Sequence, residues 1–203
     1  MLEKIKNVIS KNEPKFLGLK RETGILVPLM YVDGDINIIF QKRSANVAQP
    51  GDISFAGGHR EDGETFAETA IRETHEEMGV DFEKIELIGK LSKAYFITGM
   101  YSESFVGFIH EDFENLRPDP KEVDHLIKIP LNELLKLNPD VFTSEVVAIK
   151  DESFPYYLIE NGKDYPFYKG KDDNLFYNYD GTVIWGYTAK LLNLFLEIVR
   201  EEV

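Results

Sequence analysis

The sequence predicts an α+β or α/β sandwich, in which a β-sheet is covered by a few helices. Hydrophobic residues make up 43 % of the 203 residues, which is enough for a substantial core. Short β-rich runs alternate with turn signals, and amphipathic helical patterns lie near both ends of the chain and in its first half. No repeat, low-complexity tract or linker interrupts this pattern, so we expect one domain over residues 1–203.

The N-terminal part predicts a helix followed by a hairpin. Apolar residues at helical spacing indicate a short amphipathic helix over residues 2–11. Two β-rich runs, 24–32 and 36–41, flank the turn signal Asp33-Gly34-Asp35 and predict a β-hairpin. Pro28 lies inside the first run, and because proline cannot donate to a sheet ladder it indicates a bulge or an edge position.

A glycine-cornered loop leads into the helix that carries most of the chemistry. Residues 55–58 predict a short strand, and Thr65 to Met78 predict a helix that ends at Gly79. The expected core face of this helix consists of Phe66, Ala70, Thr74 and Met78. Further strands are expected at residues 84–91, 104–109 and 123–129, with an aromatic-rich loop over 93–103.

We expect residues 131–203 to form an elaborated C-terminal part. It begins with a short helix over 131–137 and continues with hairpins or irregular strands over 141–185. It ends in an amphipathic helix over 187–199. The residues expected to face inward from this helix are Leu191, Leu194, Phe195 and Ile198. Trp185 is expected in the core at the start of the helix, with stacking on an adenine ring as the alternative.

The composition excludes several classes of site and partner. The chain has no cysteine, which excludes disulfides, thiolate zinc sites and a cysteine nucleophile and favours a reducing, cytoplasmic location. Its 23 basic and 36 acidic residues give a net charge of −13, which argues against general binding to nucleic acid. No run is long enough to cross a membrane, and the N-terminus lacks the apolar core of a signal peptide.

The central helix places three carboxylates on one face. Residues three and four positions apart share a helix face, so Glu73 lies beside both Glu76 and Glu77. Like charges at this spacing destabilise a helix by roughly 0.2–0.5 kcal/mol per pair. A hard divalent cation such as Mg²⁺ would reverse this effect, because it binds oxygen ligands.

The spacing of these residues resembles the box of the Nudix hydrolase family. That pattern is Gly, five residues, Glu, seven residues, Arg-Glu, an aliphatic residue, any residue, Glu-Glu, any residue, Gly and an aliphatic residue. Residues 58–80 match it at every fixed position, with Thr74 where an aliphatic residue is usual. The resemblance implies a mixed β-sheet sandwiched between helices and hydrolysis of a pyrophosphate bond.

The resemblance also implies roles for individual residues. The groups expected to bind Mg²⁺, or Mn²⁺ in its place, are the backbone carbonyl of Gly58 and the carboxylates of Glu73, Glu76 and Glu77. Arg72 is expected to pair with a box carboxylate and orient it. Glu64 is expected to bind the metal, to orient a ligand, or to stabilise the helix N-terminus by its charge.

The general base stays open among three glutamates. Glu122 precedes an expected strand, at a place where the family sometimes has the base. Glu103 follows the aromatic loop, and Glu73 lies within the box. We therefore take Glu73, Glu77 and Glu122 as the catalytic candidates, with Glu103 as a rival for the base.

Two further segments resemble the coenzyme A pyrophosphatase branch of the family. Upstream of the box, Arg43-Ser44, Val47, Gly51 and Phe55 match its pattern, whereas Gln49 replaces a histidine and Ala56 a proline. Near the C-terminus, residues 184–189, Ile-Trp-Gly-Tyr-Thr-Ala, resemble a second element of that branch. This resemblance implies cleavage of coenzyme A or its thioesters to 3′,5′-ADP and (acyl-)4′-phosphopantetheine. Lys42 and Arg43 are then candidate phosphate contacts.

Other functions stay open beside this one. The same chemistry on ADP-ribose, dinucleoside polyphosphates or other nucleoside diphosphate derivatives is compatible with the departures at Gln49 and Ala56. A non-catalytic nucleotide sensor is less favoured, because all four box glutamates are present. Aromatic residues within 141–182 are expected in the core, with a substrate pocket or the surface of a homodimer as alternatives.

Overall fold

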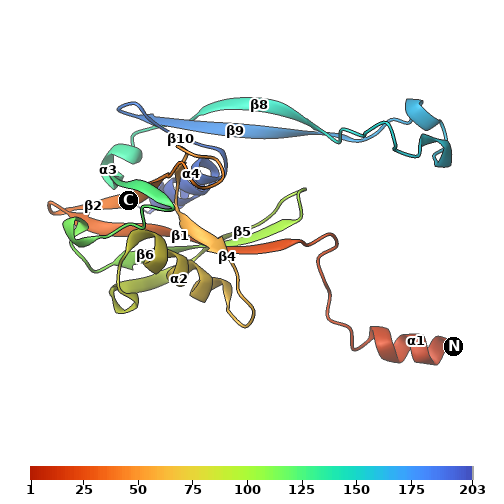
Figure 1. Ribbon diagram of the computed structural model, residues 1–203, viewed down its shortest axis with the longest axis horizontal. Helices are drawn as coiled ribbons and strands as arrows, with labels where there is room; N and C mark the ends of the chain where they lie inside the picture. The colour runs from red at the N-terminus through yellow and green to blue at the C-terminus, as the bar shows by residue number, and fades with distance from the viewer. Residues whose placement is uncertain (203) are drawn as a thin grey trace.

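The computed structural model describes residues 1–202 (Figure 1). Its helices are α1 (Leu2–Ile9), α2 (Phe66–Met78), α3 (Leu131–Leu134) and α4 (Gly186–Arg200). Its strands are β1 (Arg21–Val32), β2 (Asp35–Arg43), β3 (Ile53–Ser54), β4 (Ala56–His59), β5 (Ile85–Tyr95), β6 (Met100–Ile109), β7 (Val123–Pro130), β8 (Asp140–Val147), β9 (Lys169–Tyr179) and β10 (Thr182–Trp185). Short 3₁₀ turns lie at Phe82–Lys84, Phe113–Asn115, Tyr156–Leu158 and Gly162–Asp164.

A seven-stranded mixed sheet lies between α2 and α4, which confirms the expected fold class. The strands follow the order β3-β2-β1-β6-β5, and β4 pairs with β1 while β7 pairs with β2. The β1–β6 pairing is parallel, and the other pairings of this sheet are antiparallel. A second sheet, with the order β10-β9-β8, lies beside α4.

Strand β1 is buried on both faces, because both helices pack against it. Leu26 and Met30 belong to the core cluster on the α2 side. Val27 and Leu29 belong to the cluster on the α4 side. Side chains alternate between the faces of a strand, so a nearly continuous apolar run can serve two cores at once.

Pro28 lies in this central strand, so the expectation of an edge position was wrong. The β4 partner ends opposite Leu26, and the β2 partner begins opposite Leu29. Pro28 falls between the two, where neither antiparallel partner is paired with it, and it faces Gly107 of β6 on the other side. The missing N–H therefore lies at a gap in the ladder.

Helix α2 begins and ends as the sequence predicts. The Thr65 hydroxyl accepts a hydrogen bond from the Glu68 N–H, and the Glu68 carboxylate accepts one from the Thr65 N–H, which together make a capping box. Gly79 ends the helix in the left-handed region, with φ of 66°. A Cβ at Gly79 would lie 2.0 Å from the Arg117 carbonyl oxygen, so a side chain is excluded there.

Two expectations about local structure were wrong. Residues 93–103 do not form a long loop, because β5 extends to Tyr95 and β6 begins at Met100, which leaves a tight turn. The aromatic residues of this segment are also common in strands. Ile198 of α4 is exposed, because the buried face of that helix passes through Leu192, Phe195 and Leu196 instead.

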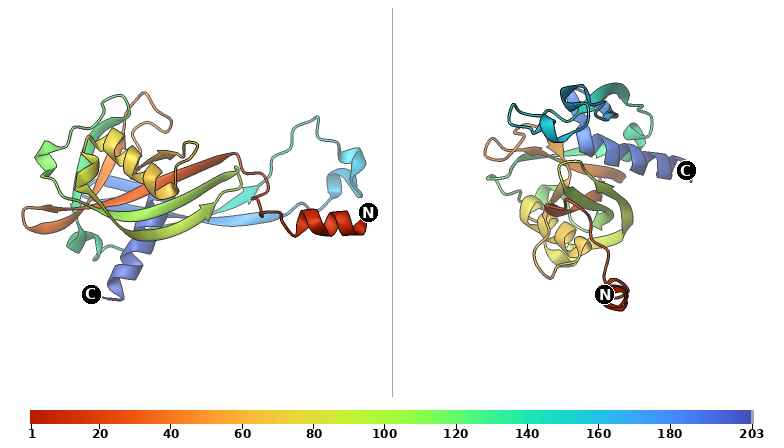
Figure 2. Two further views of the ribbon diagram at one scale, coloured as in Figure 1. Left: turned by 90° about the horizontal axis from the view of Figure 1, so that it is seen from below. Right: turned by 90° about the vertical axis from the view of Figure 1, so that its right-hand side faces the viewer.

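Two segments extend away from the sandwich at the same end of the molecule (Figures 1 and 2). One is α1, which has no buried residue. The other is the long β8–β9 hairpin, whose β8 residues are all exposed. The expectation that the aromatic residues of 141–182 lie in the core was therefore wrong for Phe142, Tyr157 and Tyr168, which are exposed. Over the described residues 1–202, no helix is long and apolar enough to cross a membrane.

Candidate functional site

The candidate site lies where β4 passes beside the carboxylate face of α2. The Gly57 N–H donates a hydrogen bond of 2.9 Å to Oε2 of Glu77. A Cβ at Gly58 would lie 2.5 Å from the Glu73 carboxyl group. Glycine at position 58 therefore lets the backbone of β4 approach the Glu73 carboxylate directly, which a larger residue there would prevent.

Arg72 ties the loop to the helix with all five of its N–H donors. Nε donates to Oε1 of Glu64 at 2.7 Å, and Nη2 donates to Oε2 of Glu64 and to the His59 carbonyl. Nη1 donates to Oε1 of Glu73 at 2.8 Å and to Oε2 of Glu76 at 3.0 Å. The rigid guanidinium thereby fixes three carboxylates of the box relative to one another.

Glu64 lies in this network rather than beside Glu77. Besides its bonds from Arg72, its carboxylate accepts hydrogen bonds from the Thr69 hydroxyl and the Glu61 N–H. The hydrogen bond from Arg72 is the main reason why the pKa of Glu64 falls to about 2. Among the three roles expected for Glu64, this geometry favours orientation of Arg72.

Glu77 and Glu73 carry charge in a poorly solvated place. Glu77 is only 4 % exposed, and burial raises its pKa from 4.5 to about 7, although the Gly57 hydrogen bond and the Gln41 side chain oppose the change. Burial also raises the pKa of Glu73, although Arg72 opposes the change. The negative charge of the exposed Glu122 carboxylate raises both pKa values further.

The carboxylates of α2 are close enough to repel one another, but they do not form a preorganised metal-binding site. Within residues 1–202, no three carboxylate or imidazole side chains converge as ligands around one point. Arg72 stands between Glu73 and Glu76 and occupies one oxygen of each. The donor set nevertheless fits a hard divalent cation, because buried carboxylates with raised pKa values are stabilised by a positive charge and offer oxygen ligands.

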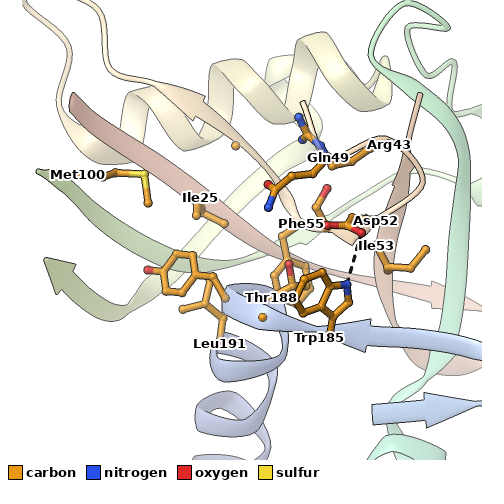
Figure 3. Close-up of a pocket in the computed structure, with 14 residues that line it drawn as sticks. Ile25, Arg43, Gln49, Asp52, Ile53, Phe55, Met100, Trp185, Thr188 and Leu191 are labelled. Atoms are coloured by element: carbon orange, nitrogen blue, oxygen red, sulfur yellow. Dashed lines mark hydrogen bonds between the residues drawn. The ribbon is translucent and has the colours of Figure 1, made fainter. Parts of the chain in front are cut away.

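A cavity of about 340 Å³ lies on the other side of Gly57 (Figure 3). One wall comes from the end of β2 and the segment that leads to β4, including Arg43, Gln49 and Asp52. The opposite wall comes from the start of α4, including Trp185 and Thr188. The two segments that resemble the coenzyme A pyrophosphatase branch are thus far apart in the chain but line one cavity beside the box.

Trp185 closes the cavity instead of packing in the core, so the expectation for this residue was wrong. Its side chain stacks on Phe176 at 5.8 Å between ring centroids, and the residue is 40 % exposed. Its Nε1–H donates a hydrogen bond of 3.3 Å to Oδ1 of Asp52 and joins the two walls. Trp185 is the last residue of β10 and directly precedes α4, and it lies outside both core clusters.

The remaining predicted residues divide between the cavity and the surface. Arg43 lines the cavity and donates from Nε to the Ala48 carbonyl. Its neighbour Lys42 is outside the lining and lies 3.8 Å from Asp124. Glu103, the rival base, is held by Lys90 and by the Tyr101 hydroxyl. Asp52 was missed by the sequence prediction, although it lies in the segment that carries the second resemblance.

The buried carboxyl of Glu77 makes stability depend on pH. Its pKa in the folded protein, about 7, lies above the ordinary value of 4.5, so its contribution is complete below pH 4.5 and is lost as pH rises through 7. Between pH 5 and pH 8 we expect the metal-free protein to lose on the order of 3 kcal/mol through this group. Urea unfolding in a chelating buffer measures the change.

Glu77→Gln provides the control for this prediction, because its amide is neutral at every pH and can still accept the Gly57 N–H. We expect the variant to lose most of the pH dependence of the free energy of unfolding in this range. The same slope for the variant and the unsubstituted protein would show that Glu77 is not the group responsible.

The chain matches known proteins over most of its length. The profile of the NUDIX domain matches residues 20–148. Nudix hydrolase 3 of Caenorhabditis elegans is 37 % identical over 116 residues, which cover 55 % of this chain and 48 % of that protein. The peroxisomal coenzyme A diphosphatase NUDT7 of Mus musculus is 28 % identical over 180 residues, covering 88 % of this chain and 70 % of that protein.

The chain thus spans about half the length of the first of these relatives. Among solved structures, the Nudix hydrolase RenU of M. Smegmatis is 19 % identical, with a TM-score of 0.49 over 61 % of this chain and 78 % of that one. The NUDIX profile covers more than half of the chain, including the glycine-cornered loop, the Arg72 network and the buried carboxylates. The chain therefore belongs to the Nudix hydrolase family.

Proposed function

We propose that the protein is a metal-dependent pyrophosphatase that hydrolyses coenzyme A or its thioesters. The observation that carries the substrate assignment is the cavity beside Gly57, whose two walls are the segments that resemble the coenzyme A branch. NUDT7, a coenzyme A diphosphatase by name, aligns with 88 % of the chain, a range that includes more than the box. The products would be 3′,5′-ADP and 4′-phosphopantetheine or its acylated form.

The carboxylates of α2 supply the proposed metal site. Glu73, Glu76 and Glu77, with the Gly58 carbonyl, would hold Mg²⁺ or Mn²⁺. When bound, the ion would neutralise charge on the phosphate oxygens and lower the pKa of an attacking water. Arg72 positions Glu73 and Glu76 through its two Nη1 hydrogen bonds. This arrangement concentrates positive charge where the pyrophosphate would lie, within a protein of net charge −13.

Glu122 is the proposed general base. Its carboxylate is exposed, its side chain has no hydrogen-bond partner among the described residues, and its charge reaches both Glu73 and Glu77. It would accept a proton from the water while the water oxygen bonds to phosphorus in line with the bridging oxygen. The bridging P–O bond breaks, and its electron pair leaves with the departing phosphate. Glu103 is less suited, because two hydrogen bonds already hold its carboxylate.

A second candidate class of substrate would undergo the same pyrophosphate hydrolysis but would place a different substituent in the cavity. Gln49 lines the cavity where the coenzyme A branch has histidine, and its backbone has φ of 55°. A different side chain at this point favours a different substituent on the diphosphate, as in ADP-ribose or a dinucleoside polyphosphate. A substrate panel separates the two classes.

Replacement of Glu77 tests the metal site. We expect Glu77→Gln to lower Mg²⁺-dependent turnover by at least about 100-fold while the fold is kept, because a neutral amide is a much poorer ligand for a hard cation. Glu83→Gln is the matched control, since Glu83 is exposed on a 3₁₀ turn away from the network. Turnover within a few-fold of the unsubstituted protein would remove Glu77 from the site.

The substrate panel tests the cavity. Coenzyme A, acetyl-coenzyme A, ADP-ribose and diadenosine tetraphosphate are incubated with Mg²⁺, and the products are identified by mass. We expect 3′,5′-ADP to be released from the first two at the highest kcat/KM. Arg43→Ala should raise KM for coenzyme A by about tenfold, as expected when a charged hydrogen bond to phosphate is lost. Lys42→Ala should change it by less than about twofold, as for an exposed ion pair.

A preference for ADP-ribose or diadenosine tetraphosphate would assign the second substrate class. Equal effects of Arg43→Ala and Lys42→Ala on KM would show that the cavity does not hold the substrate phosphates.

A further inference from the structure

Two exposed apolar surfaces project from the same end of the molecule. The first belongs to the N-terminal arm, residues 1–20, and the second to the hairpin tip, residues 149–168. The right-hand view of Figure 2 looks onto this end and shows the two on opposite sides of it. Neither surface is covered by the sandwich, because α1 has no buried residue and the tip lies beyond the ends of β8 and β9.

The arm presents an apolar helix face. Leu2, Ile5, Val8 and Ile9 lie on one side of α1, and each is between 51 % and 65 % exposed. Most of the stability of a helix this short comes from packing of its apolar face. An amphipathic helix of eight residues that packs on nothing is therefore expected to have a partner surface.

Residues 16–20, the base of the arm, are held against the β5–β6 hairpin. Phe16 stacks on Tyr95 and Tyr101 at the end of the β5–β6 hairpin. The Tyr95 hydroxyl donates a hydrogen bond of 2.6 Å to the Leu17 carbonyl, and the Lys20 N–H donates one of 2.8 Å to the Gly99 carbonyl. These contacts fix residues 16–20 against the β5–β6 hairpin, and α1 lies beyond them, away from the sandwich (Figure 1).

The hairpin tip is an organised aromatic cluster. Phe154 and Tyr156 each contact Phe167 edge-on, and Nζ of Lys150 lies 3.5 Å from the centroid of the Phe167 ring. This packing holds the outward side chains in place. The most exposed apolar residues of the tip are Ile149, Tyr157, Leu158 and Tyr168, and each is more than 70 % exposed.

The two surfaces have opposite charge. The arm contains five lysines and two glutamates, a net charge of +3 in a protein whose total is −13. Residues 140–173, which form the hairpin and its tip, contain four lysines and eight acidic residues, a net charge of −4. Complementary charge around apolar contacts favours and orients association.

We propose that the arm of one molecule docks on the hairpin tip of a second copy, and that the second arm docks on the first tip in return. Because both surfaces lie at one end of the chain, a single twofold rotation brings both pairs together. The apolar face of α1 would cover Tyr157 and Leu158, with the arm lysines facing the acidic hairpin. The association covers both exposed surfaces at once and leaves the Nudix site free.

A second copy accounts for these observations better than a lipid surface does. An anionic membrane would attract the arm, but the acidic hairpin at the same end would be repelled by it. Docking of the arm on its own tip would require α1 to cross to the opposite side of this end of the molecule, where the tip lies (Figure 2). Reciprocal docking between two copies requires neither contact of the acidic hairpin with an anionic membrane nor a rearrangement of α1.

Cysteine cross-linking tests the proposal directly, because the chain contains no cysteine of its own. Val8→Cys protein is mixed with Leu158→Cys protein under mild oxidation. We expect a covalent heterodimer to form at least about tenfold faster than for Val8→Cys mixed with Ile88→Cys, because docking raises the effective concentration of the thiols. Ile88 is an exposed control on β5. Equal rates for the two mixtures would contradict the docking.

Two further measurements distinguish docking on a second copy from docking within one chain and from binding to a membrane. They use the chain that carries both Val8→Cys and Leu158→Cys, and the unsubstituted protein. In sedimentation at micromolar concentration, we expect a dimer that Ile5→Lys converts to a monomer and that Asn7→Lys, on the polar face of α1, leaves intact. A monomer in every case overturns the proposal, as does an exclusively intrachain disulfide in the Val8→Cys, Leu158→Cys chain. Co-sedimentation of a monomeric protein with phosphatidylserine vesicles would assign the arm to a membrane instead.

Discussion

The burial of Glu73 and Glu77 against the glycines of β4 is the constraint on which the site depends. Two carboxylates that lose water in each other's presence raise the free energy of the folded chain unless positive charge lies nearby. Arg72 supplies part of that charge through its hydrogen bond to Glu73, while its other donors bind Glu64, Glu76 and the His59 carbonyl. We propose that the carboxylate oxygens that accept no hydrogen bond from Arg72 are ligands of a divalent ion.

The fold serves this constraint from both faces of the sheet. A central strand buried on both sides, β1, holds β4 in register so that Gly57 and Gly58 meet α2. The capping box and Gly79 fix where α2 begins and ends, and therefore where its carboxylates lie. On the opposite face, α4 begins beside the segment before β4, so the cavity forms next to the box rather than elsewhere on the surface.

The sequence predicted local features well where a single physical rule decides them. The helix over α2 and its stop at Gly79 follow from spacing and from a left-handed glycine, and the box pattern identified the family. Features set by tertiary packing were harder to predict. Pro28 is tolerated in a central strand only because two partners meet there, and Trp185 closes a cavity only because Asp52 faces it from a distant segment. Neither of these tertiary arrangements produces a periodic pattern in the sequence.

The most direct test is the stability of the protein with and without Mg²⁺ at pH 8, where Glu77 is ionised. If the buried carboxylates form the metal site, millimolar Mg²⁺ should raise the free energy of unfolding of the unsubstituted protein, since a ligand that binds only the folded state stabilises it. The increase should be largely absent in Glu77→Gln. An equal increase in both proteins, or none in either, would contradict the account.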